Sequence, residues 1–566
     1  MVNSVPRVKV GALLALTATA VIASFFSVGY YPGEDVTFHM GFWFEVARQW
    51  HEGIVYARWA AQSMYGYGNP TMIFYPPMDR ILGGALVAFL PSRLALGTYA
   101  WLGLALGGFG FFHLCREFFD DRSSLVAAFV YVINPYNLFV LYMRSALGEF
   151  LAAALFPWFI LAVYRLAEKR KRSLPVLALV IALLWLTNPP AGVIANYAAA
   201  LLVATLAWVR RSKSLLRLFL LAEVLGAGLA AFYIMPAWRQ QPLINVGNLR
   251  HVGLSADFLL SKLSIWAFKN EVLLTTGFIW QIAFGGLAWF QARKSPAQRR
   301  EIFVALTMIL AVSAFMCVPV SFIVWKYTPF LSYIQFPWRW LFPLNLAMAF
   351  FIAAALSQSE RRSWLPVAAC TYSLLLILSC SAVRNRALDW NAFAAPFQSG
   401  FIYDDEDYIP KAAGVYPEEG PLPTWLPSPR FAVLDGSAQD RQPLSKGGPA
   451  ESASLTKFAV QSWKTESRIF TVDSPRPARV RVRLFYYPGW HVWVNGTEVE
   501  DVERDAHDAI VVRVPSGHSR IQLVFKNTPD ETWGMIISGL VAMLVATLSV
   551  PQVIRRGRHS AGVRPL

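Results

Sequence analysis

The chain is poor in charge and in cysteine. Only 15% of its 566 residues are charged, whereas 55% are hydrophobic and 14% are aromatic. A soluble domain is usually about one quarter charged, so this composition excludes a soluble globular protein. The 4 cysteines show neither a disulfide framework nor zinc-binding spacing, which excludes a small domain stabilised by either device.

Several enzyme signatures are also missing. The sequence contains no Walker motif, no dinucleotide-binding glycine motif, no hydrolase nucleophile elbow and no evident internal repeat. Nothing in the chain therefore indicates nucleotide hydrolysis, dinucleotide-dependent redox chemistry or serine-hydrolase chemistry.

Long apolar runs are what the chain has instead. A membrane-spanning helix needs about 20 predominantly apolar residues. The runs predict a polytopic α-helical membrane protein with about 12 spans, at residues 10–30, 95–115, 123–143, 150–167, 174–192, 193–209, 214–235, 272–292, 302–325, 340–358, 363–383 and 532–554. The run 78–91 is too short to span, so we expect it to lie in the outer interface.

The basic residues gather in alternate loops of this topology. The net charge is +16, and basic runs such as "RLAEKRKRS" and "VRRSKSLLR" fall on one side of the predicted membrane. This distribution follows the positive-inside rule rather than the pattern of a nucleic-acid surface. Both termini are therefore expected in the cytoplasm, and the loop 31–93 outside.

The chain divides into three predicted parts. Residues 1–383 form the transmembrane domain, 384–531 an extracytoplasmic domain, and 532–566 the last span with a basic cytoplasmic tail. The extracytoplasmic domain begins with a proline- and acid-rich stretch, but from about residue 451 its apolar residues alternate. Alternation with an Asn495-Gly496 turn predicts antiparallel strands, which we assign to a β-sandwich.

The first candidate site follows the first span. Glu34, Asp35 and His39 lie on the outer side, where a carboxylate is able to act as a general base. If a helix begins here, Asp35 as its N-cap is the structural alternative. His39 lies one turn further on and is included among the predicted substrate contacts, although its spacing is more typical of a structural hydrogen bond than of a metal ligand.

Two arginine segments lie on the same side. One is "YMRSALGEF", with Arg144 and Glu149, and the other is "FLSYIQFPWRWLFP", with Gln335, Trp338 and Arg339. A guanidinium matches phosphate geometry, so both arginines are predicted phosphate ligands, with Arg339 the stronger candidate and Glu149 orienting Arg144. Ion pairs within the protein are the structural alternative.

Further predicted substrate contacts come from the aromatic first loop and from Asn188. The loop "YGYGNPTMIFYPP" offers Tyr65, Tyr67 and Tyr75 for stacking, with a membrane-interface belt as the alternative. Asn188 in "LTNPP" lies on the same outer side. These residues complete the predicted binding wall.

The order of these motifs resembles a known family. "GEDVTFH", "YGYGNPTMIFYPP", "YMRSALGE", "YIQFPWRWL" and "YYPGWHVWVNG" occur in this order in 6-pyruvoyl-tetrahydropterin synthase-related membrane proteins and their YfhO-like relatives. Both groups resemble the GT-C glycosyltransferases. The resemblance implies a GT-C-like fold in the bacterial cytoplasmic membrane, a polyprenyl-phosphate sugar donor and a catalytic acidic residue early in the first outer loop. Asp35 matches that position, with Glu34 as its competitor.

Metal use varies among GT-C enzymes, so a divalent cation is a further expectation and no cofactor is assigned. The first outer loop has no "DxD" motif, and the acidic run 404–407 is the other place for a cation, with a solvated charge run as its alternative.

The resulting hypothesis is a membrane glycosyltransferase. It moves a sugar from a polyprenyl-phosphate-type donor to an envelope glycan, lipid or protein on the outer side. One alternative is a lipid or polysaccharide transporter, for which Glu223 is the best intramembrane charge. Another is a non-catalytic envelope-assembly protein.

Overall fold

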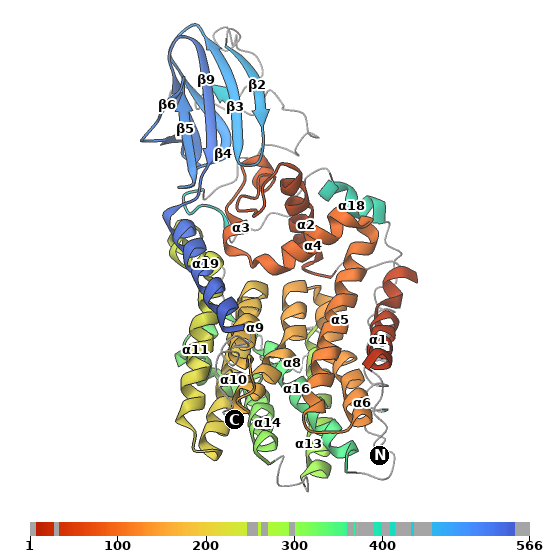
Figure 1. Ribbon diagram of the computed structural model, residues 1–566. Helices are drawn as coiled ribbons and strands as arrows, with labels where there is room; N and C mark the ends of the chain where they lie inside the picture. The colour runs from red at the N-terminus through yellow and green to blue at the C-terminus, as the bar shows by residue number, and fades with distance from the viewer. Residues whose placement is uncertain are drawn as a thin grey trace, which may run out of the picture.

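The structure is a computed structural model. It describes residues 7–27, 33–245, 258–261, 270–293, 300–358, 390–398, 408–413, 432–434 and 456–549, together with residues 367 and 371. A bundle of helices forms one end of the molecule, and a β-region stands on the other end (Figure 1). Between them lies a layer of short helices from the first loop.

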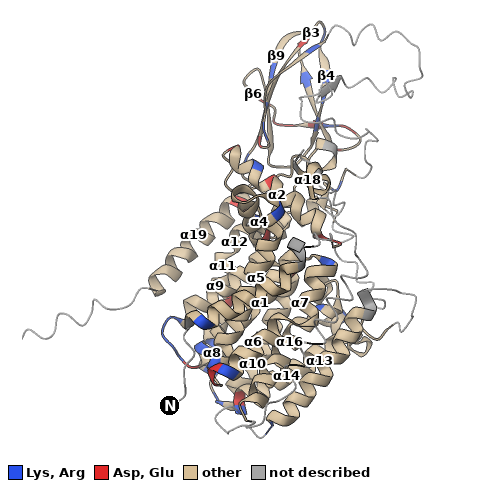
Figure 2. Ribbon diagram, turned by 90° about the vertical axis from the view of Figure 1, so that its right-hand side faces the viewer, with Lys and Arg blue, Asp and Glu red and all other residues tan. Residues whose placement is uncertain are grey.

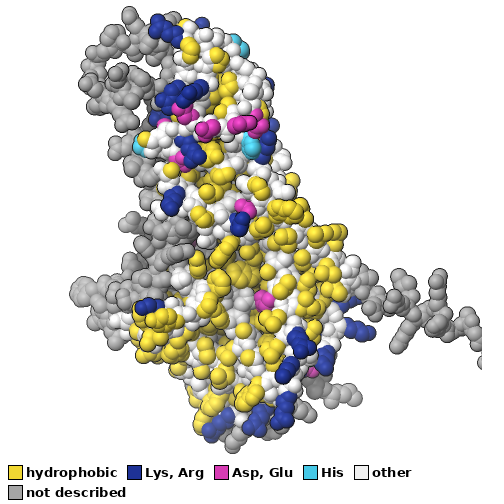
Figure 3. All heavy atoms as spheres, turned by 90° about the vertical axis from the view of Figure 1, so that its left-hand side faces the viewer, with side chains coloured by type: hydrophobic (Ala, Val, Ile, Leu, Met, Phe, Trp, Pro, Cys, Tyr) yellow, Lys and Arg dark blue, Asp and Glu magenta, His cyan; other side chains and the backbone are white. Residues whose placement is uncertain are grey.

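The helical bundle is built from the apolar runs. Its long helices are α1 (Arg7–Ser27), α5 (Ser92–Arg116), α6 (Asp121–Val132), α8 (Leu147–Ala167), α9 (Ser173–Thr187), α10 (Pro189–Val209), α11 (Lys213–Leu229), α13 (Asn270–Ala292), α14 (Arg300–Met316), α16 (Leu341–Leu356) and α19 (Pro529–Ser549). Hydrophobic side chains cover the face of this body shown in Figure 3. A bundle that is apolar outside as well as inside is suited to lipid rather than water.

Within the described ranges, 7 helices are long and apolar enough to cross a membrane, or up to 9 if two bent pairs count as spans. The predicted spans 10–30 and 174–192 correspond to shorter apolar helices, and the predicted span 363–383 lies almost wholly outside the described residues. The protein is thus a polytopic helical membrane protein, and the number twelve stays a prediction.

Two predicted spans are broken rather than continuous. The run 214–235 becomes α11 and α12 (Ala231–Arg239), bent by 76°. Ser538 of α19 lies at the break, where its hydroxyl accepts from Phe232 N–H at 2.9 Å and donates to Gly228 O at 3.0 Å. The side chain thereby replaces backbone hydrogen bonds that the bend removes.

The second broken span contains a proline at the bend. The run 302–325 becomes α14 and α15 (Phe322–Tyr327), and the chain turns by 95° at Pro319. The Ser321 hydroxyl donates to Val318 O at 2.8 Å, a carbonyl that also accepts from Ser321 N–H at 3.1 Å. Proline has no N–H to continue the helix, which explains why the apolar run does not form one straight span.

The first loop forms a compact layer over the bundle. It contains α2 (Val36–His51), α3 (Thr71–Phe74) and α4 (Pro77–Phe89). In Figure 1 α4 lies across the top of the bundle, beside α2 and above α8 and α9. This helix covers most of the run 78–91, and it is not among the helices long enough to span. A short helix α18 (Trp390–Gln398) packs against α2, with Phe397 stacked on Phe44 at 6.2 Å.

The β-region contains two antiparallel sheets, in the strand orders β1-β4-β8-β7 and β2-β3-β9-β5-β6. Its strands are β1 (Ala432–Leu434), β2 (Lys457–Trp463), β3 (Ser467–Ser474), β4 (Ala478–Phe485), β5 (Trp490–Val494), β6 (Thr497–Glu498), β7 (Glu503–Arg504), β8 (Ala509–Val514) and β9 (Gly517–Phe525). Asn495 and Gly496 have φ of +50° and +84°, so the predicted turn between β5 and β6 is present. Buried side chains of both sheets belong to one hydrophobic cluster.

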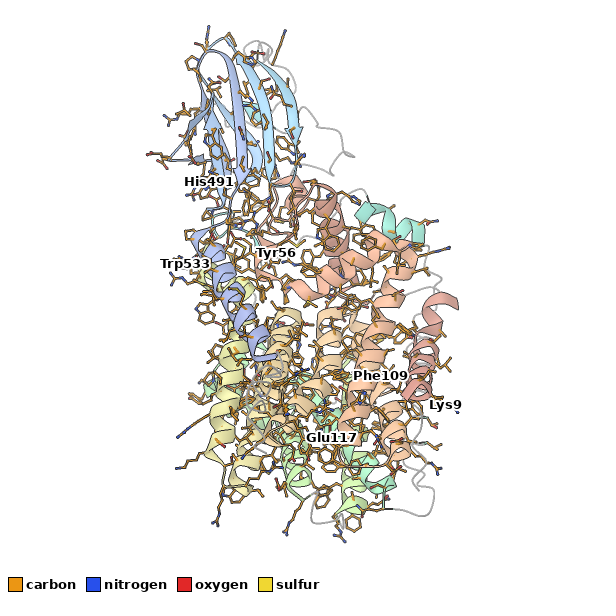
Figure 4. The ribbon with its side chains drawn as sticks, viewed as in Figure 1. Lys9, Tyr56, Phe109, Glu117, His491 and Trp533 are labelled. Carbon is orange, nitrogen blue, oxygen red and sulfur yellow. The ribbon has the colours of Figure 1, made fainter. Side chains whose placement is uncertain are left out.

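The β-region is joined to the first loop and to α12 by buried contacts. Phe485 N–H donates to Tyr67 O at 3.1 Å, and the Tyr487 hydroxyl donates to Gln240 Oε1 at 2.6 Å. Tyr56, labelled in Figure 4 at this level, contacts Phe232 of α12 with ring centroids 5.5 Å apart. Trp533 of α19 projects outward just below and is 58% exposed.

Candidate functional site

The site forms where the first loop meets the turn between two helices of the bundle. The chain α6, α7 (Pro135–Phe139) and a π-helical turn (Val140–Arg144) ends at Ser145, whose φ of +54° turns the backbone into α8. Asp35 N–H donates to Arg144 O at 2.8 Å and Gly33 N–H donates to Ser145 Oγ at 3.1 Å. These bonds join two segments more than 100 residues apart.

Gly33 makes this close approach possible. A Cβ atom there would lie 2.8 Å from the carbonyl carbon of Arg144 and would also overlap the Ser145 hydroxyl. Real Cβ atoms essentially never come that close to backbone atoms, so a larger residue would push the two segments apart. The first residue of "GEDVTFH" therefore has a steric role.

The Arg144 guanidinium binds both predicted catalytic carboxylates. Its Nη2 lies 2.9 Å from Asp35 Oδ2, and its Nε lies 3.2 Å from Glu34 Oε2. Asp35 precedes α2, but its side chain makes no capping hydrogen bond. Asp35 thus occupies the N-cap position of the structural alternative, while its carboxylate binds Arg144 rather than the first N–H groups of the helix. Both carboxylates are partly exposed, with 46% of the Glu34 side chain and 35% of the Asp35 side chain accessible.

Arg339 belongs to a second, deeper cluster. Its Nε donates to Glu149 Oε2 at 2.7 Å, and its Nη1 donates to Ile334 O at 2.5 Å and to Gln335 Oε1 at 3.2 Å. The Tyr136 hydroxyl donates to the other oxygen of Glu149 at 2.5 Å. Arg339 and Glu149 are both buried, so this pair is an internal ion pair. The predicted assignment of Glu149 to Arg144 is wrong, because Glu149 contacts Arg339.

One aromatic ring connects the two clusters. The guanidinium carbons of Arg144 and Arg339 lie 5.0 Å and 5.1 Å from the centroid of Phe336. Trp338 stacks on Phe336 at 5.3 Å, and Arg144 also lies 5.5 Å from the Trp338 ring. Cations over aromatic faces are held by the ring quadrupole, so Phe336 helps to position both arginines and Trp338 helps to position Arg144.

His39 has a structural place rather than a ligand-binding one. It is buried, with Nδ1 lying 2.7 Å from Asp79 Oδ2, and Leu147 N–H donates to its Nε2 at 3.1 Å. Since Nε2 accepts, Nδ1 carries the proton and donates to Asp79. One imidazole thus fastens α2, α4 and the start of α8 together. The prediction that His39 contacts substrate is wrong, because no part of the ring reaches the surface.

The remaining predicted residues are dispersed. Asn188 caps α10, its Oδ1 accepting from Ala191 N–H at 2.9 Å, and Tyr67 is buried and stacks on Phe485 of the β-region at 4.9 Å. Neither belongs to the arginine clusters. Tyr75 lies nearer, 6.0 Å from the His39 ring, and Tyr65 is a residue whose side chain lies outside the described set.

Three residues of the site were missed. Asp79 gains its role from His39 and Tyr136 from Glu149, whereas Phe336 lies inside the segment "YIQFPWRWL" but gains its role from the distant Arg144 as well as from Arg339. Gln335 was found, and its φ of +67° adds a sign that the segment before Arg339 is held in a special conformation.

No group of three or more His, Cys, Asp or Glu suited to a metal ion occurs among the residues that the structure describes. The acidic run 404–407 lies outside them. The expectation of a divalent cation therefore stays a prediction.

With this geometry in view, the matched family is informative. The family model named "6-pyruvoyl-tetrahydropterin synthase related domain; membrane protein" matches residues 72–388, which is more than half of the chain. The chain belongs to this family. The matched range contains both arginine segments, and the family assignment made from the motifs is confirmed.

Solved structures similar to the chain are membrane glycosyltransferases. The arabinofuranosyltransferase AftD from mycobacteria is 18% identical, with a TM-score of 0.41, and the match covers 70% of this chain and 27% of that one. The oligosaccharyltransferase of Archaeoglobus fulgidus is 18% identical, with a TM-score of 0.33, and the match covers 70% and 53%. The chain thus spans about half or less of the length of these proteins. No curated protein matches it.

Proposed function

We propose that this membrane protein is a glycosyltransferase that uses a polyprenyl-phosphate-type sugar donor on the extracytoplasmic side. The observation that carries the proposal is the Asp35–Arg144 pair. A carboxylate that is one-third exposed, and that makes no capping hydrogen bond to its helix, faces a guanidinium that lies over the Phe336 and Trp338 rings. General base and phosphate ligand are thereby within 2.9 Å of each other.

The two arginines have different roles in this proposal. Arg339 is itself buried and is held by Glu149, Ile334 O and the partly buried Gln335, so it serves to fix the segment that carries Phe336 and Trp338. Arg144 is bound by partly exposed carboxylates that an incoming phosphate is able to displace. Arg144 therefore replaces Arg339 as the leading phosphate ligand.

The chemical step follows from these positions. Asp35 takes the proton of an acceptor hydroxyl, whose oxygen forms a bond to the anomeric carbon of the donor sugar. The bond between that carbon and the phosphate oxygen breaks, and its electron pair stays on the lipid phosphate. Arg144 stabilises the negative charge that develops there, which is the usual largest single contribution to catalysis of such transfers.

The charge distribution supports the sidedness. The Lys and Arg residues at the ends of the bundle helices gather at the end away from the β-region (Figure 2). Glu117, labelled near that end in Figure 4, binds Arg165 and Arg170. Under the positive-inside rule this end faces the cytoplasm, so the β-region and the Asp35–Arg144 pair face outward.

Turnover of lipid-linked sugars tests the proposal. Purified protein in lipid nanodiscs is incubated with a panel of radiolabelled polyprenyl-phosphate sugars, and sugar release and transfer are followed. We expect turnover of at least one donor, and a loss of about 10²–10³-fold in Arg144→Gln, the size found for removing one charge-stabilising donor. Arg165→Gln, which removes an arginine from the opposite end, is the matched control and keeps wild-type activity. If no donor is turned over, or if both variants behave alike, the proposal fails.

A further inference from the structure

Basic residues are concentrated at one corner of the bundle, at the end away from the β-region. The turns that join α8 to α9 and α10 to α11 lie there, and dark-blue side chains gather at the lower end of the face in Figure 3. Acidic groups of the same end are already occupied, because Glu117, Glu168 and Glu301 bind other arginines. Six exposed bases, which we call the basic patch, have no ion-pair partner among the residues that the structure describes: Lys169, Lys171, Arg172, Arg211, Lys213 and Arg217.

The positive-inside rule asks for basic residues at this end but not for their concentration in one corner. The turn between α5 and α6 lies at the same end, as the label of Glu117 in Figure 4 shows. It carries Arg116 and Arg122 together with Glu117, Asp120 and Asp121. Acids outnumber bases in that turn, so it has no surplus of positive charge. The basic patch therefore needs an explanation of its own.

The two helices that follow the patch lie side by side. α9 and α11 run in the same direction, because each is joined to α10 by a short turn and α10 runs opposite to both. Their contact fixes the register, since a Cβ atom on Gly226 of α11 would lie 2.5 Å from Ile181 Cγ2 of α9. Counting back equally along both helices, from 226 to 217 and from 181 to 172, brings Arg217 level with Arg172.

α11 presents its bases and its exposed apolar residues on one face. Lys213, Arg217, Leu220 and Val224 follow one another at spacings of four, three and four residues, which places them in one stripe along the helix. Leu220 is 62% exposed and Val224 is 69% exposed. The stripe therefore begins with positive charge and continues as a surface suited to hydrocarbon.

α9 repeats this pattern at the same level. Arg172, Val176 and Leu179 also share one face, and both apolar side chains are 50% exposed. A ligand that covers the two stripes must be anionic where it meets the bases and apolar along the rest. A soluble anion or an acidic protein surface satisfies only the first requirement, whereas a lipid with a negative headgroup satisfies both.

We propose that the basic patch and the two stripes bind anionic phospholipid of the surrounding bilayer, with its phosphate at Arg172 and Arg217 and its acyl chains along Leu179 and Leu220. The stripes are open surface rather than an enclosed channel, so the bilayer lipids that surround the protein in excess are the occupants, drawn by the charge. The N-cap residues of α9 and α11, Arg172 and Ser212, make no side-chain capping hydrogen bond, so the positive ends of both helix dipoles face the same phosphate. This site lies at the end of the bundle opposite to the proposed transfer site. It goes beyond the proposed function and does not depend on it.

Photo-crosslinking with lipids that differ only in the headgroup tests this site. The protein is placed in phosphatidylcholine nanodiscs that contain a trace of phosphatidylglycerol with a diazirine in one acyl chain, or the matching phosphatidylcholine probe, and labelled peptides are identified by mass spectrometry. We expect the phosphatidylglycerol probe to label α9 and α11 more strongly than the phosphatidylcholine probe. Arg172→Gln and Arg217→Gln each lower this preference about fivefold, the size expected for one base near a membrane surface.

Two further variants serve as controls. Arg122→Gln removes an exposed base from the α5–α6 turn at the same end and leaves the preference unchanged. Arg217→Lys keeps the charge and most of the preference, which separates loss of charge from a folding defect.

Three outcomes overturn the proposal. The first is equal labelling of α9 and α11 by the two probes, and the second is a phosphatidylglycerol preference that is the same on all lipid-facing helices. The third is displacement of the phosphatidylglycerol probe by an equal trace of polyprenyl phosphate, which assigns the patch to that lipid instead. Because the readout is covalent labelling, these results do not depend on transferase activity.

Discussion

The charged side chains of the site include one partly exposed ion pair and one buried ion pair. The Asp35–Arg144 pair is accessible to water and to a ligand, whereas the Arg339–Glu149 pair is enclosed. An exposed ion pair contributes little to stability, but breaking a buried one leaves an uncompensated charge. The first pair is therefore available for chemistry, and the second for structure.

Substitution of Glu149 tests this division. We expect Glu149→Gln to destabilise the protein by about 3–5 kcal/mol, because Arg339 then keeps a buried charge without its carboxylate. Glu34→Gln, in the partly exposed pair, is the matched control and costs less than about 1 kcal/mol. Thermal unfolding in detergent, followed by tryptophan fluorescence, measures both. Equal losses in the two variants would contradict the division into structural and chemical pairs.

The ring shared by the two arginines is a second target. Phe336→Leu removes two cation–π contacts of about 0.5–1 kcal/mol each, so we expect the KM for the lipid donor to rise about 3- to 10-fold. The fold is expected to persist, since a leucine still fills most of the space. Phe330→Leu, at a half-exposed position outside the clusters, serves as the control. An unchanged KM in Phe336→Leu would show that the ring does not position the arginines.

At the scale of single residues, the sequence identified the candidate reactive side chains but not the contacts between them. Arg144 was identified because an ionisable group at the membrane end of a predicted span is uncommon, and Asp35 because the family resemblance implies an acidic residue early in the first outer loop. Their pairing was not identified, because the sequence offered Glu149 as the carboxylate partner of Arg144. The bonds from Asp35 N–H to Arg144 O and from Gly33 N–H to Ser145 Oγ bring Asp35 to Arg144 instead. Phe336 and Asp79 carry no local signal of their roles.

Packing between elements depends on small residues. Gly83 of α4 lies directly under the Trp43 indole of α2, and a Cβ there would overlap the ring. The same helix carries Asp79, which holds His39 and, through it, the start of α8. The fit of α4 against α2 thus positions the backbone from which Arg144 emerges.

We expect Gly83→Ala to destabilise the protein by about 1–3 kcal/mol through overpacking, and to lower activity as α4 shifts. Gly286→Ala in α13 is the matched control, since a Cβ there meets nothing within 4 Å and the helix gains about 0.5–1 kcal/mol from losing a glycine. Unfolding temperature and transfer rate are measured for both. A neutral Gly83→Ala would mean that α2 and α4 are less closely packed than the structure shows.

A helix can be predicted from the sequence where a single physical rule decides its length and position. Residues 77–89 form a short apolar helix, close to the expected 78–91, because its length forbids a span. The bends within 214–235 and 302–325 were missed, because the first depends on a serine hydroxyl replacing backbone bonds and the second on Pro319. In the first bend the serine comes from α19, some 300 residues away. A hydropathy profile averages over many residues and therefore does not show such breaks.

The whole molecule is held together at the junction of the first loop and the β-region. Arg58 Nη2 lies 2.9 Å from Glu466 Oε1, and Thr465 N–H donates to Glu52 Oε2 at 2.8 Å. Burial raises the pKa of Glu466 above its usual value of 4.5, Arg58 opposes the rise, and Glu531 and Glu52 add to it. This junction fixes the β-region to the first loop.

The raised pKa of Glu466 predicts a pH dependence. A group with a raised folded-state pKa contributes stability that is fully present below pH 4.5 and is lost as the pH rises through the raised value. We therefore expect unfolding temperatures to fall over this interval in wild type. In Glu466→Gln, which cannot titrate, that part of the pH dependence disappears. Identical pH profiles for the two proteins would mean that Glu466 does not titrate differently in the folded state.

The central claim concerns the carboxylate that faces Arg144, and one comparison tests it most directly. Transfer rates from the best polyprenyl-phosphate sugar donor are measured for wild type, Asp35→Asn and Glu34→Gln, with donor binding and folding checked separately. We predict that Asp35→Asn lowers the rate by about 10²–10⁴-fold, as expected for loss of a general base, while donor binding persists. Glu34→Gln is predicted to change the rate only a few-fold. An Asp35→Asn protein that is folded, binds donor and transfers sugar at the wild-type rate would contradict the account.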